Sequence, residues 1–201
     1  MKANPSRRPL PGLADQGQAV RLQDQKSRFV ILRNPGFWIT LQYMIHLNPI
    51  GIIRTPYREK EGMPIQPAGA KGTRGQVIMD REYTRGLKDL ESFSHLILIY
   101  FFHECEGYDL EVIPFLDSAK RGLFATRAPR RPNAVGLSVV RLLEIRENVL
   151  EIENVDMLDG TPLLDIKPYI GDFDQIGDYR GGWTEQAGPG VRKARSDRRF
   201  S

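Results

Sequence analysis

Apolar residues in the middle of the chain form short runs with the two-residue alternation of β-strands, and turn-forming Gly, Pro and Asn separate these runs. The clearest run is 95–103, His-Leu-Ile-Leu-Ile-Tyr-Phe-Phe-His, which is apolar on both faces and predicts a strand buried on both sides. Alternation places His95 and His103 at the two ends of one face of this strand. Another strand is predicted over 46–53.

Two more β-rich runs, 137–146 and 149–155, meet at Glu147 and Asn148, where Asn tolerates a positive φ angle and so predicts a hairpin turn. The one segment with helical character is 81–93, and a glycine interrupts it. No Gly-x-Gly-x-x-Gly sequence follows a predicted strand, which argues against a dinucleotide-binding fold. The pattern therefore predicts a mainly β protein, an antiparallel barrel or sandwich with few short helices.

The two ends of the chain differ from the middle. Residues 1–36 and 181–201 are rich in Pro, Gln, Arg, Gly and Ser and have few periodic apolar positions, so both are predicted to be disordered. Met44 comes just before the first convincing strand, so translation starts either at Met1, with a genuine basic tail, or at Met44. The predicted division is a basic tail or mis-assigned start over 1–43, a barrel domain over 44–174 and a second basic tail over 175–201.

Composition excludes several classes of protein. In 201 residues, 40% hydrophobic content is enough for a packed core. One cysteine and three histidines provide neither a disulfide framework nor the ligands of a zinc site, so no metal is predicted. The longest apolar stretch, 37–53, is interrupted by polar residues, and the N-terminus lacks the apolar block of a secretory signal. We therefore expect a soluble, cytoplasmic protein that does not enter a membrane.

The net charge of +4 comes from the two ends of the chain. Residues 1–43 hold 7 basic and 2 acidic side chains, 175–201 hold 6 and 3, and 44–174 hold 16 and 20. Within that acidic middle, 120–131 contains five Lys or Arg residues and no acid. Because salt screens charges over about 10 Å, such a local patch can bind phosphate whatever the global charge.

Three segments could carry chemistry. In 64–75, glycines spaced three apart let the backbone approach a ligand, although a mobile surface loop has the same composition. In 124–133, two prolines stiffen a segment with three arginines, whose planar guanidinium groups suit phosphate or carboxylate, although a solvated basic loop is the alternative. In 156–169, three carboxylates, a lysine and a tyrosine lie together. Asp165 and Lys167 share a strand face there. They form either a purely structural ion pair or a pair in which the lysine keeps the carboxylate ionised and able to accept a proton.

Four motifs that occur in order carry a resemblance to a known family. They are Pro-Ile-Gly-Ile-Ile-Arg-Thr-Pro-Tyr at 49–57, Phe-Ser-His-Leu at 93–96, Phe-Ala-Thr-Arg at 124–127 with Arg-Pro-Asn at 131–133, and Asp-Gly-Thr-Pro-Leu-Leu-Asp-Ile-Lys-Pro-Tyr at 159–169. With these motifs the chain resembles the TsaA-like, or TrmO, family of S-adenosylmethionine-dependent tRNA methyltransferases over roughly 48–174.

The resemblance implies a compact single-sheeted β-barrel that forms a homodimer and methylates N6 of threonylcarbamoyladenosine beside the tRNA anticodon. The implied contacts to S-adenosylmethionine are Pro67, Ala68, Gly69, His103, Glu104, Arg127, Leu137, Glu153, Asn154, Val155 and Asp156. From their charge and position we expect Arg130, Arg131 and Asn133 to bind the substrate, with the arginines, Arg127 among them, on tRNA phosphates or the threonyl carboxylate. Many relatives have Arg where this chain has Ile65, and bacterial relatives often add a C-terminal domain where a short basic tail follows Tyr169 here.

The acceptor nitrogen lies between a purine and a urea carbonyl and still carries a proton, so a general base should help the reaction. The candidate bases are Asp156, Asp159 and Asp165, with Lys167 and Tyr169 to orient the base or the substrate. Two other functions fit the same residues. One is a non-catalytic RNA-binding barrel with a remnant cofactor pocket, and the other is a methyltransferase that acts on a small molecule.

Overall fold

The computed structural model describes residues 22–24, 27–30, 42–43, 45–186 and 194–200. The described residues after Leu47 belong to one compact unit, Asn48–Ser201, and those before it group separately. In the N-terminal group, three short strands form an antiparallel sheet, namely β1 (Leu22–Asp24), β2 (Ser27–Val30) and β3 (Gln42–Tyr43). The rest of the predicted N-terminal tail lies outside the described residues.

The larger unit consists of short strands and very short helices. Its strands are β4 (Gly51–Arg54), β5 (Arg74–Met79), β6 (His95–Phe101), β7 (Glu111–Val112), β8 (Arg121–Gly122), β9 (Val135–Arg146), β10 (Val149–Glu153) and β11 (Thr161–Pro168). Its helices are the 3-10 helices η1 (Pro67–Gly69), η2 (Arg81–Leu87), η3 (Leu90–Ser92), η4 (Leu123–Ala125) and η6 (Arg198–Phe200), and the one-turn α1 (Gly171–Asp174). Among the described residues, no helix has the length and apolar character needed to cross a bilayer.

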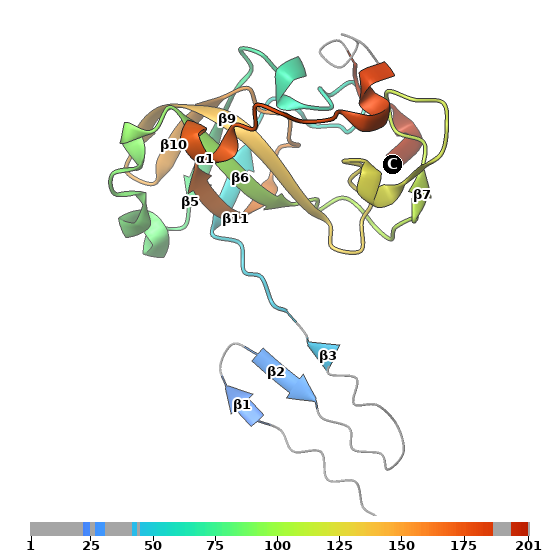
Figure 1. Ribbon diagram of the computed structural model, residues 1–201. Coiled ribbons are helices and arrows are strands. Elements are labelled where there is room, and N and C mark those ends of the chain that lie inside the picture. The colour runs from blue at the N-terminus through green and yellow to red at the C-terminus, as the bar shows by residue number, and fades with distance from the viewer. Residues whose placement is uncertain (1–21, 25–26, 31–41, 44, 187–193, 201) are drawn as a thin grey trace, which may run out of the picture. The chain divides into compact units, whose positions relative to one another are not determined.

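Six strands close into a barrel in the order β10-β5-β4-β11-β6-β9, and every neighbouring pair is antiparallel (Figure 1). The β9–β10 hairpin completes the closure, so the barrel has no free edge. The remaining pair, β7 and β8, forms a separate two-stranded sheet. This architecture confirms the predicted mainly β, single-sheeted antiparallel barrel with few short helices.

Alternate residues of each barrel strand fill the interior. Ile53, Leu98, Val140, Ile152 and Leu163 come from five different strands and have no exposed surface. Burial of each such side chain stabilises the folded state by roughly 1.5–3 kcal/mol. The core thus follows from the period-two pattern of the sequence, because a sheet that curls into a barrel can bury only one of its two faces.

Strand β6 differs from its prediction in one respect. Leu96, Leu98 and Tyr100 are buried, whereas the alternate residues are only partly buried and Phe101 is exposed. The prediction that this strand is buried on both sides was wrong for the described residues. An all-apolar strand is expected to be covered on its outer face too, but no layer of the described residues covers that face completely. The strand also ends at Phe101, so His103 lies in the loop that follows.

The turn between β9 and β10 and the predicted helix also differ in detail. The residue with positive φ is Glu147, at 54°, and the side chain of Asn148 instead donates a hydrogen bond from Nδ2 to the carbonyl oxygen of Met79 at 2.7 Å. The predicted helix over 81–93 consists of η2 and η3, which are separated at Asp89 with φ of 67°. The first predicted barrel strand, 46–53, is the shorter β4.

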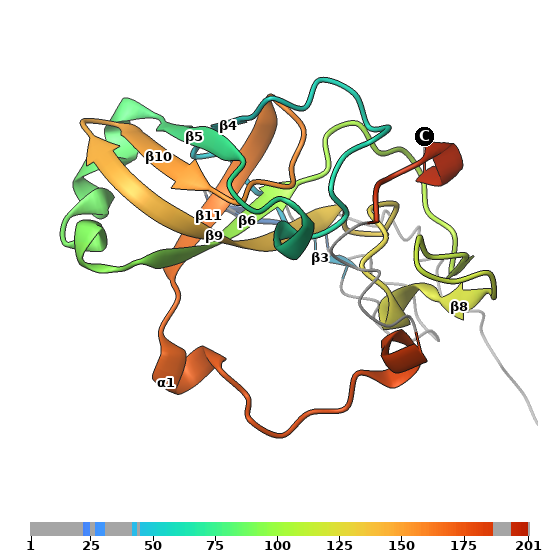
Figure 2. The same cartoon turned by 90° about the horizontal axis from the view of Figure 1, so that it is seen from above.

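The C-terminal tail, 181–201, differs in part from its predicted disorder. After α1 the chain runs away from the barrel and returns beside β8, as Figure 2 shows. Residues 194–200 then pack on the loops next to the barrel, and Phe200 is buried with Val112, Leu123 and Ala128. The buried ring of Phe200 and the hydrogen bonds of Ser196 anchor a polar segment whose composition by itself predicts no structure.

Candidate active site

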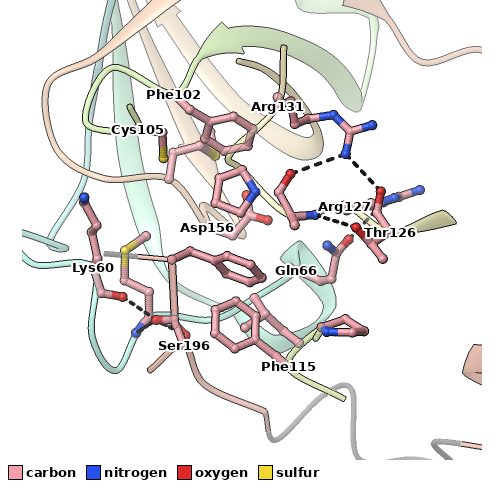
Figure 3. Close-up of a pocket in the computed structure, with 18 of the residues that line it drawn as sticks. Lys60, Gln66, Phe102, Cys105, Phe115, Thr126, Arg127, Arg131, Asp156 and Ser196 are labelled. Atoms are coloured by element: carbon pink, nitrogen blue, oxygen red, sulfur yellow. Dashed lines mark hydrogen bonds between the residues drawn. The ribbon is translucent and has the colours of Figure 1, made fainter. Parts of the chain in front are cut away.

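A cavity of about 880 Å³ lies where the end of β6 and the start of β9 meet the neighbouring loops. Figure 3 shows Asp156 between the side of the cavity formed by Lys60 and Ser196 and the side formed by Arg127 and Arg131. The walls come from Tyr100 of β6 and 135–137 of β9, and from the loop residues 63–66, 102–105, 114–116, 124–129, 131 and 156–158. Parts of 183–200 near the C-terminus complete them. Because these segments are far apart in sequence, only the closed barrel brings them together.

A chain of three polar groups leads from the barrel core to the cavity. Ser138 on β9 donates a hydrogen bond from Oγ to Oδ1 of Asp156 at 2.7 Å. Because its single hydrogen is used there, Ser138 accepts the hydrogen bond that its Oγ shares with the hydroxyl of Tyr100 at 3.0 Å. The buried Tyr100 and Ser138 thus hold the carboxylate of Asp156 in one orientation at the wall of the cavity.

The local environment shifts the ionisation of two of these groups. Burial raises the pKa of Asp156 to about 6, against the opposing effects of the Ser138 hydrogen bond and the Arg127 charge. Burial and the nearby Asp156 charge also raise the pKa of Tyr100, so its hydroxyl stays protonated and able to donate. Asp156 therefore has a carboxyl group that can both release and accept a proton near neutral pH.

The opposite side of the cavity is cationic. Arg127 lines it and donates a hydrogen bond from Nη1 to Oε1 of Gln66 at 2.9 Å. Arg131 is bound to its own loop, since its Nη1 donates to the carbonyl oxygens of Thr126 at 3.1 Å and Ala128 at 3.3 Å. Thr126 Oγ1 in turn donates to the carbonyl oxygen of Leu123 at 2.8 Å. These bonds fix the arginine loop, residues 124–133. The guanidinium of Arg127 lies beside Gln66 at the cavity wall, where it can meet a ligand.

The C-terminal segment forms part of the cavity wall. Ser196 Oγ accepts a hydrogen bond from the backbone nitrogen of Met63 at 2.9 Å and donates to the carbonyl oxygen of Lys60. The Phe200 ring packs edge-on against Phe115, with 5.1 Å between ring centroids. Both aromatic rings line the cavity. A segment predicted to be disordered therefore covers one side of the candidate site.

Five of the eleven predicted cofactor contacts line this cavity: His103, Glu104, Arg127, Leu137 and Asp156. The others lie outside its lining. Pro67, Ala68 and Gly69 form η1, directly after the lining residue Gln66. Val155 is buried in the barrel core, and Glu153 contacts Arg141 with 3.7 Å between charged atoms. Asn154 accepts a hydrogen bond from the backbone nitrogen of Gly72 at 3.0 Å, so it holds the glycine loop in place.

The predicted tRNA contacts are divided in the same way. Arg131 lines the cavity, whereas Arg130 and Asn133 do not. Arg130 lies 3.7 Å from the carboxylate of Asp109, between Nη2 and Oδ2, and its buried Nε has no hydrogen-bond partner among the described residues.

Of the five residues predicted to take part in catalysis, Asp156 lines the cavity, and Asp159, Asp165, Lys167 and Tyr169 do not. Asp159 binds Arg58 at 2.7 Å and Arg54 at 3.4 Å and accepts from the backbone nitrogen of Thr55. Asp165 and Lys167 form an ion pair of 2.8 Å whose side chains are about half exposed. The backbone nitrogen of Tyr169 donates to the carbonyl oxygen of His95 at 3.0 Å. Each of these residues thus has a structural partner within the protomer.

Several residues of the site were not predicted from the sequence. Gln66, Tyr100 and the aromatic residues Phe102, Phe115, Trp183 and Phe200 line the cavity, and Ser138 supports Asp156 from the core. A signal existed for two of them. Tyr100 and Ser138 are polar groups at inward positions of otherwise apolar strands, and a buried hydroxyl needs a partner. The aromatic residues come from loops and the C-terminal segment, where periodicity gives no guidance.

The cavity joins three chemical features: a carboxylate near neutral pKa, a guanidinium, and apolar walls that include Met63, Phe102 and Phe115. Its volume lies in the range of sites for small organic molecules and cofactors. The arrangement suits a ligand that carries a positive charge, a negative charge and flat or apolar groups. Among the described residues, no three His, Cys, Asp or Glu side chains cluster in the manner of a metal site.

Comparison with known proteins identifies relatives of this chain. The family model of the tRNA-methyltransferase O N-terminal domain matches residues 52–175. A Pyrococcus abyssi protein named a probable S-adenosyl-L-methionine-binding protein is 51% identical over 162 residues, 81% of this chain and 88% of the relative. The Escherichia coli tRNA (adenine(37)-N6)-methyltransferase is 36% identical over 148 residues, 69% of this chain and 63% of the relative.

A solved structure has the same barrel. The crystal structure of TrmO from Pseudomonas aeruginosa superposes with a TM-score of 0.59 at 38% sequence identity. The match covers 70% of this chain and spans only 63% of the length of the solved chain. With a family model that matches most of the chain and relatives of this identity, the protein belongs to the tRNA-methyltransferase O family.

Proposed function

We propose that this protein transfers a methyl group from S-adenosylmethionine to N6 of threonylcarbamoyladenosine next to the anticodon of tRNA. The observation that carries the proposal is the position of Asp156, a carboxylate with a pKa of about 6 that lines the cavity, held by Ser138 and Tyr100. Family membership supports the chemistry, since relatives are named for binding the cofactor or for methylating adenine in tRNA.

The cavity fits S-adenosylmethionine. The cofactor has a sulfonium cation, an amino-acid end and an adenine ring, and the cavity has a carboxylate, a guanidinium at Arg127 and apolar walls. Arg127 would bind the cofactor carboxylate in the bidentate manner of guanidinium groups. When bound, the cofactor supplies a methyl group already activated by the positive sulfur. The main tasks left to the protein are alignment of the two reactants and removal of one proton.

Asp156 would remove that proton. Of the three carboxylates considered as the general base, Asp156 lines the cavity, whereas Asp159 and Asp165 have structural ion-pair partners outside it. Formation of the bond from N6 to the methyl carbon would break the carbon–sulfur bond, whose electron pair stays on the departing thioether sulfur, and Asp156 would accept the N–H proton. A base with a pKa near the working pH is the efficient choice, because it is ionised before the step and basic enough to accept the proton.

The direct test is transfer of labelled methyl from S-adenosylmethionine to threonylcarbamoylated tRNA and to the same tRNA without the modification. Label is expected only in the modified tRNA, and Arg127→Ala should lose most of the transfer because it removes the guanidinium that we expect to bind the cofactor carboxylate. Label in both tRNAs would contradict the proposed requirement for threonylcarbamoyladenosine. Label in neither would contradict the proposed methyltransferase activity. Transfer to a small molecule that does not depend on RNA would favour the small-molecule methyltransferase.

We also propose that the protein is a homodimer through the outer face of β6 and β9. Ile97 pairs with Val139 and Ile99 with Leu137 on that face, next to Phe101. Leu137 is 52% exposed and Phe101 41%, which makes an apolar patch of the kind that protein partners cover. Since Leu137 also lines the cavity, a second copy on this face would lie beside the site.

Ile97→Glu should convert the dimer into a monomer, because a charge would then be buried at the centre of the interface. Sedimentation velocity of the wild type and the variant checks this expectation. Ile176→Glu is the matched control, as Ile176 is exposed and lies outside β6 and β9. A wild type that sediments as a monomer at micromolar concentration would contradict the homodimer.

A further inference from the structure

Two aromatic side chains of the cavity have no task in the mechanism above. Phe124 in η4 lines the cavity and yet is 74% exposed, which is unusual for a ring of this size. Trp183 also lines the cavity and lies outside residues 52–175, which the family model matches. Both line the same cavity although they are 59 residues apart in the sequence.

A hydrogen bond fixes the indole against the turn that carries Phe124. Trp183 Nε1 donates to the carbonyl oxygen of Ala125 at 2.8 Å, and Ala125 follows Phe124 in the chain. The backbone nitrogen of Thr126 donates to the carbonyl oxygen of Leu123, so the turn that carries Phe124 is closed as well. The indole and the turn that carries Phe124 are therefore in place before any ligand arrives, which lowers the entropic cost of binding.

Each ring also has a guanidinium group over it. The Cζ atom of Arg131 lies 5.7 Å from the centroid of Phe124, and that of Arg121 lies 5.8 Å from the centroid of Trp183. Both arginines are themselves anchored, Arg131 by backbone carbonyls and Arg121 by Asp117 at 2.7 Å. Fixed aromatic rings among arginines are the usual means by which proteins bind single-stranded RNA, with bases stacked on the rings and phosphates near the cations.

We infer that Phe124 and Trp183 form a stacking platform for unpaired bases of an RNA loop at the mouth of the cavity. This inference rests on the proposed function in that the ligand is RNA, and it names residues that bind the RNA and not the cofactor. An adenosine that enters the cavity must leave the stack of its neighbours, and a platform at the mouth compensates the lost stacking of the bases next to it.

The test uses the full chain, an anticodon stem-loop RNA and the same RNA with abasic positions in the loop. Phe124→Ala and Trp183→Ala should each weaken binding of the intact loop roughly tenfold, because stacking on one aromatic residue contributes about that much. The affinity for S-adenosylmethionine, measured without RNA, should fall less than the RNA affinity in both variants. Phe173→Ala is the matched control, since Phe173 is 78% exposed on α1 and does not line the cavity.

Two further readouts separate stacking from charge. The salt dependence of RNA binding should keep its slope in Phe124→Ala, because no phosphate contact is removed. In a Trp38→Phe background Trp183 is the one tryptophan left, and its fluorescence should be quenched saturably by the intact loop. The abasic loop should bind the wild type and both variants equally, since it has no base to stack.

The outcomes distinguish this inference from the proposed function. If the wild type transfers methyl but Phe124→Ala and Trp183→Ala bind the loop RNA as tightly as the wild type does, the platform is overturned and the proposed enzyme activity stands. Base-dependent RNA binding that needs both rings, without methyl transfer to any tRNA, supports the platform and overturns the proposed reaction. A wild type that does not bind the loop RNA overturns the platform.

Discussion

Asp156→Asn is expected to slow methyl transfer by about 10²–10⁴-fold, the contribution typical of a positioned general base. Asparagine has the shape of aspartate and can still accept the hydrogen bond from Ser138, so the barrel and the cavity should remain intact. It cannot take a proton from the acceptor nitrogen. Single-turnover methylation of threonylcarbamoylated tRNA, with cofactor affinity measured separately by calorimetry, checks this expectation.

The pH dependence of the wild type should identify the same group. Since burial raises the pKa of Asp156 to about 6, the rate should fall about tenfold for each pH unit below that value as the base becomes protonated. The Asp156→Asn variant should have no such limb. A purely structural role of Asp156 would lower the rate equally at every pH.

Stability should depend on pH in the opposite direction. A pKa raised above its ordinary value of about 3.9 means that the folded state binds the proton more tightly than the unfolded state, so stability falls as pH rises from about 4 to about 6. Because the carboxyl group also faces the cavity, where solvent screens it, we expect a contribution on the order of 1–2 kcal/mol. Asp156→Asn should remove this dependence, as thermal unfolding at pH 5 and 7 would show.

Asp165→Asn is the matched control, because this carboxylate is half exposed and pairs with Lys167 outside the cavity. Its rate should stay within about twofold of the wild type, as an exposed ion pair contributes at most about 1 kcal/mol to stability. If Asp165→Asn lost transfer and Asp156→Asn kept it, the assignment of the base would be wrong.

Gly136→Ala is expected to destabilise the protein by about 1–3 kcal/mol and to impair methyl transfer as well. A Cβ atom at Gly136 would overlap the ring of Tyr100 and approach Cζ of Phe102 to 2.8 Å. Tyr100 would have to move, and it is the first member of the hydrogen-bonded chain to Asp156 through Ser138. One methyl group on β9 thus disturbs the barrel core and the orientation of the base together.

Thermal unfolding and the methyl-transfer rate measure the two effects. For a protein of this size, 1 kcal/mol corresponds to about 2–4 °C in Tm. Gly86→Ala is the control, because a Cβ there meets no atom within 4 Å, and its Tm should change little. Equal Tm values for the two variants would show that the tight packing of Tyr100 on Gly136 does not exist in solution.

The barrel could be predicted largely from the sequence, because closing a β-sheet requires alternation that the chain displays openly. The predicted runs at 95–103, 137–146 and 149–155 correspond to β6, β9 and β10, and the hairpin lies at the predicted position. The arginine loop was also recognised from composition, since two prolines and three arginines define a rigid cationic turn without reference to tertiary structure.

The positions of the acidic residues show what sequence could not decide. By alternation from the buried Thr161 and Leu163, Asp165 would point into the barrel. The pairing of β11 with β6 shifts register between Leu163 and Asp165, which leaves Leu164 as an extra residue, so Asp165 lies outside. A bulge of one residue reverses the faces of all residues that follow, and nothing in the local sequence announces it.

The cavity depends even more on tertiary structure. Tyr100, Ser138 and Asp156 meet only because β6 and β9 pair in one register and the chain returns after β10 to the same end of the barrel. Phe200 and Trp183 reach the cavity through contacts made far from their neighbours in sequence. The sequence by itself determined the barrel, the arginine loop and the family. The shared cavity, and the choice of Asp156 among the candidate bases, required the tertiary structure, because local patterns contain periodicity and composition but not the long-range register that places side chains side by side.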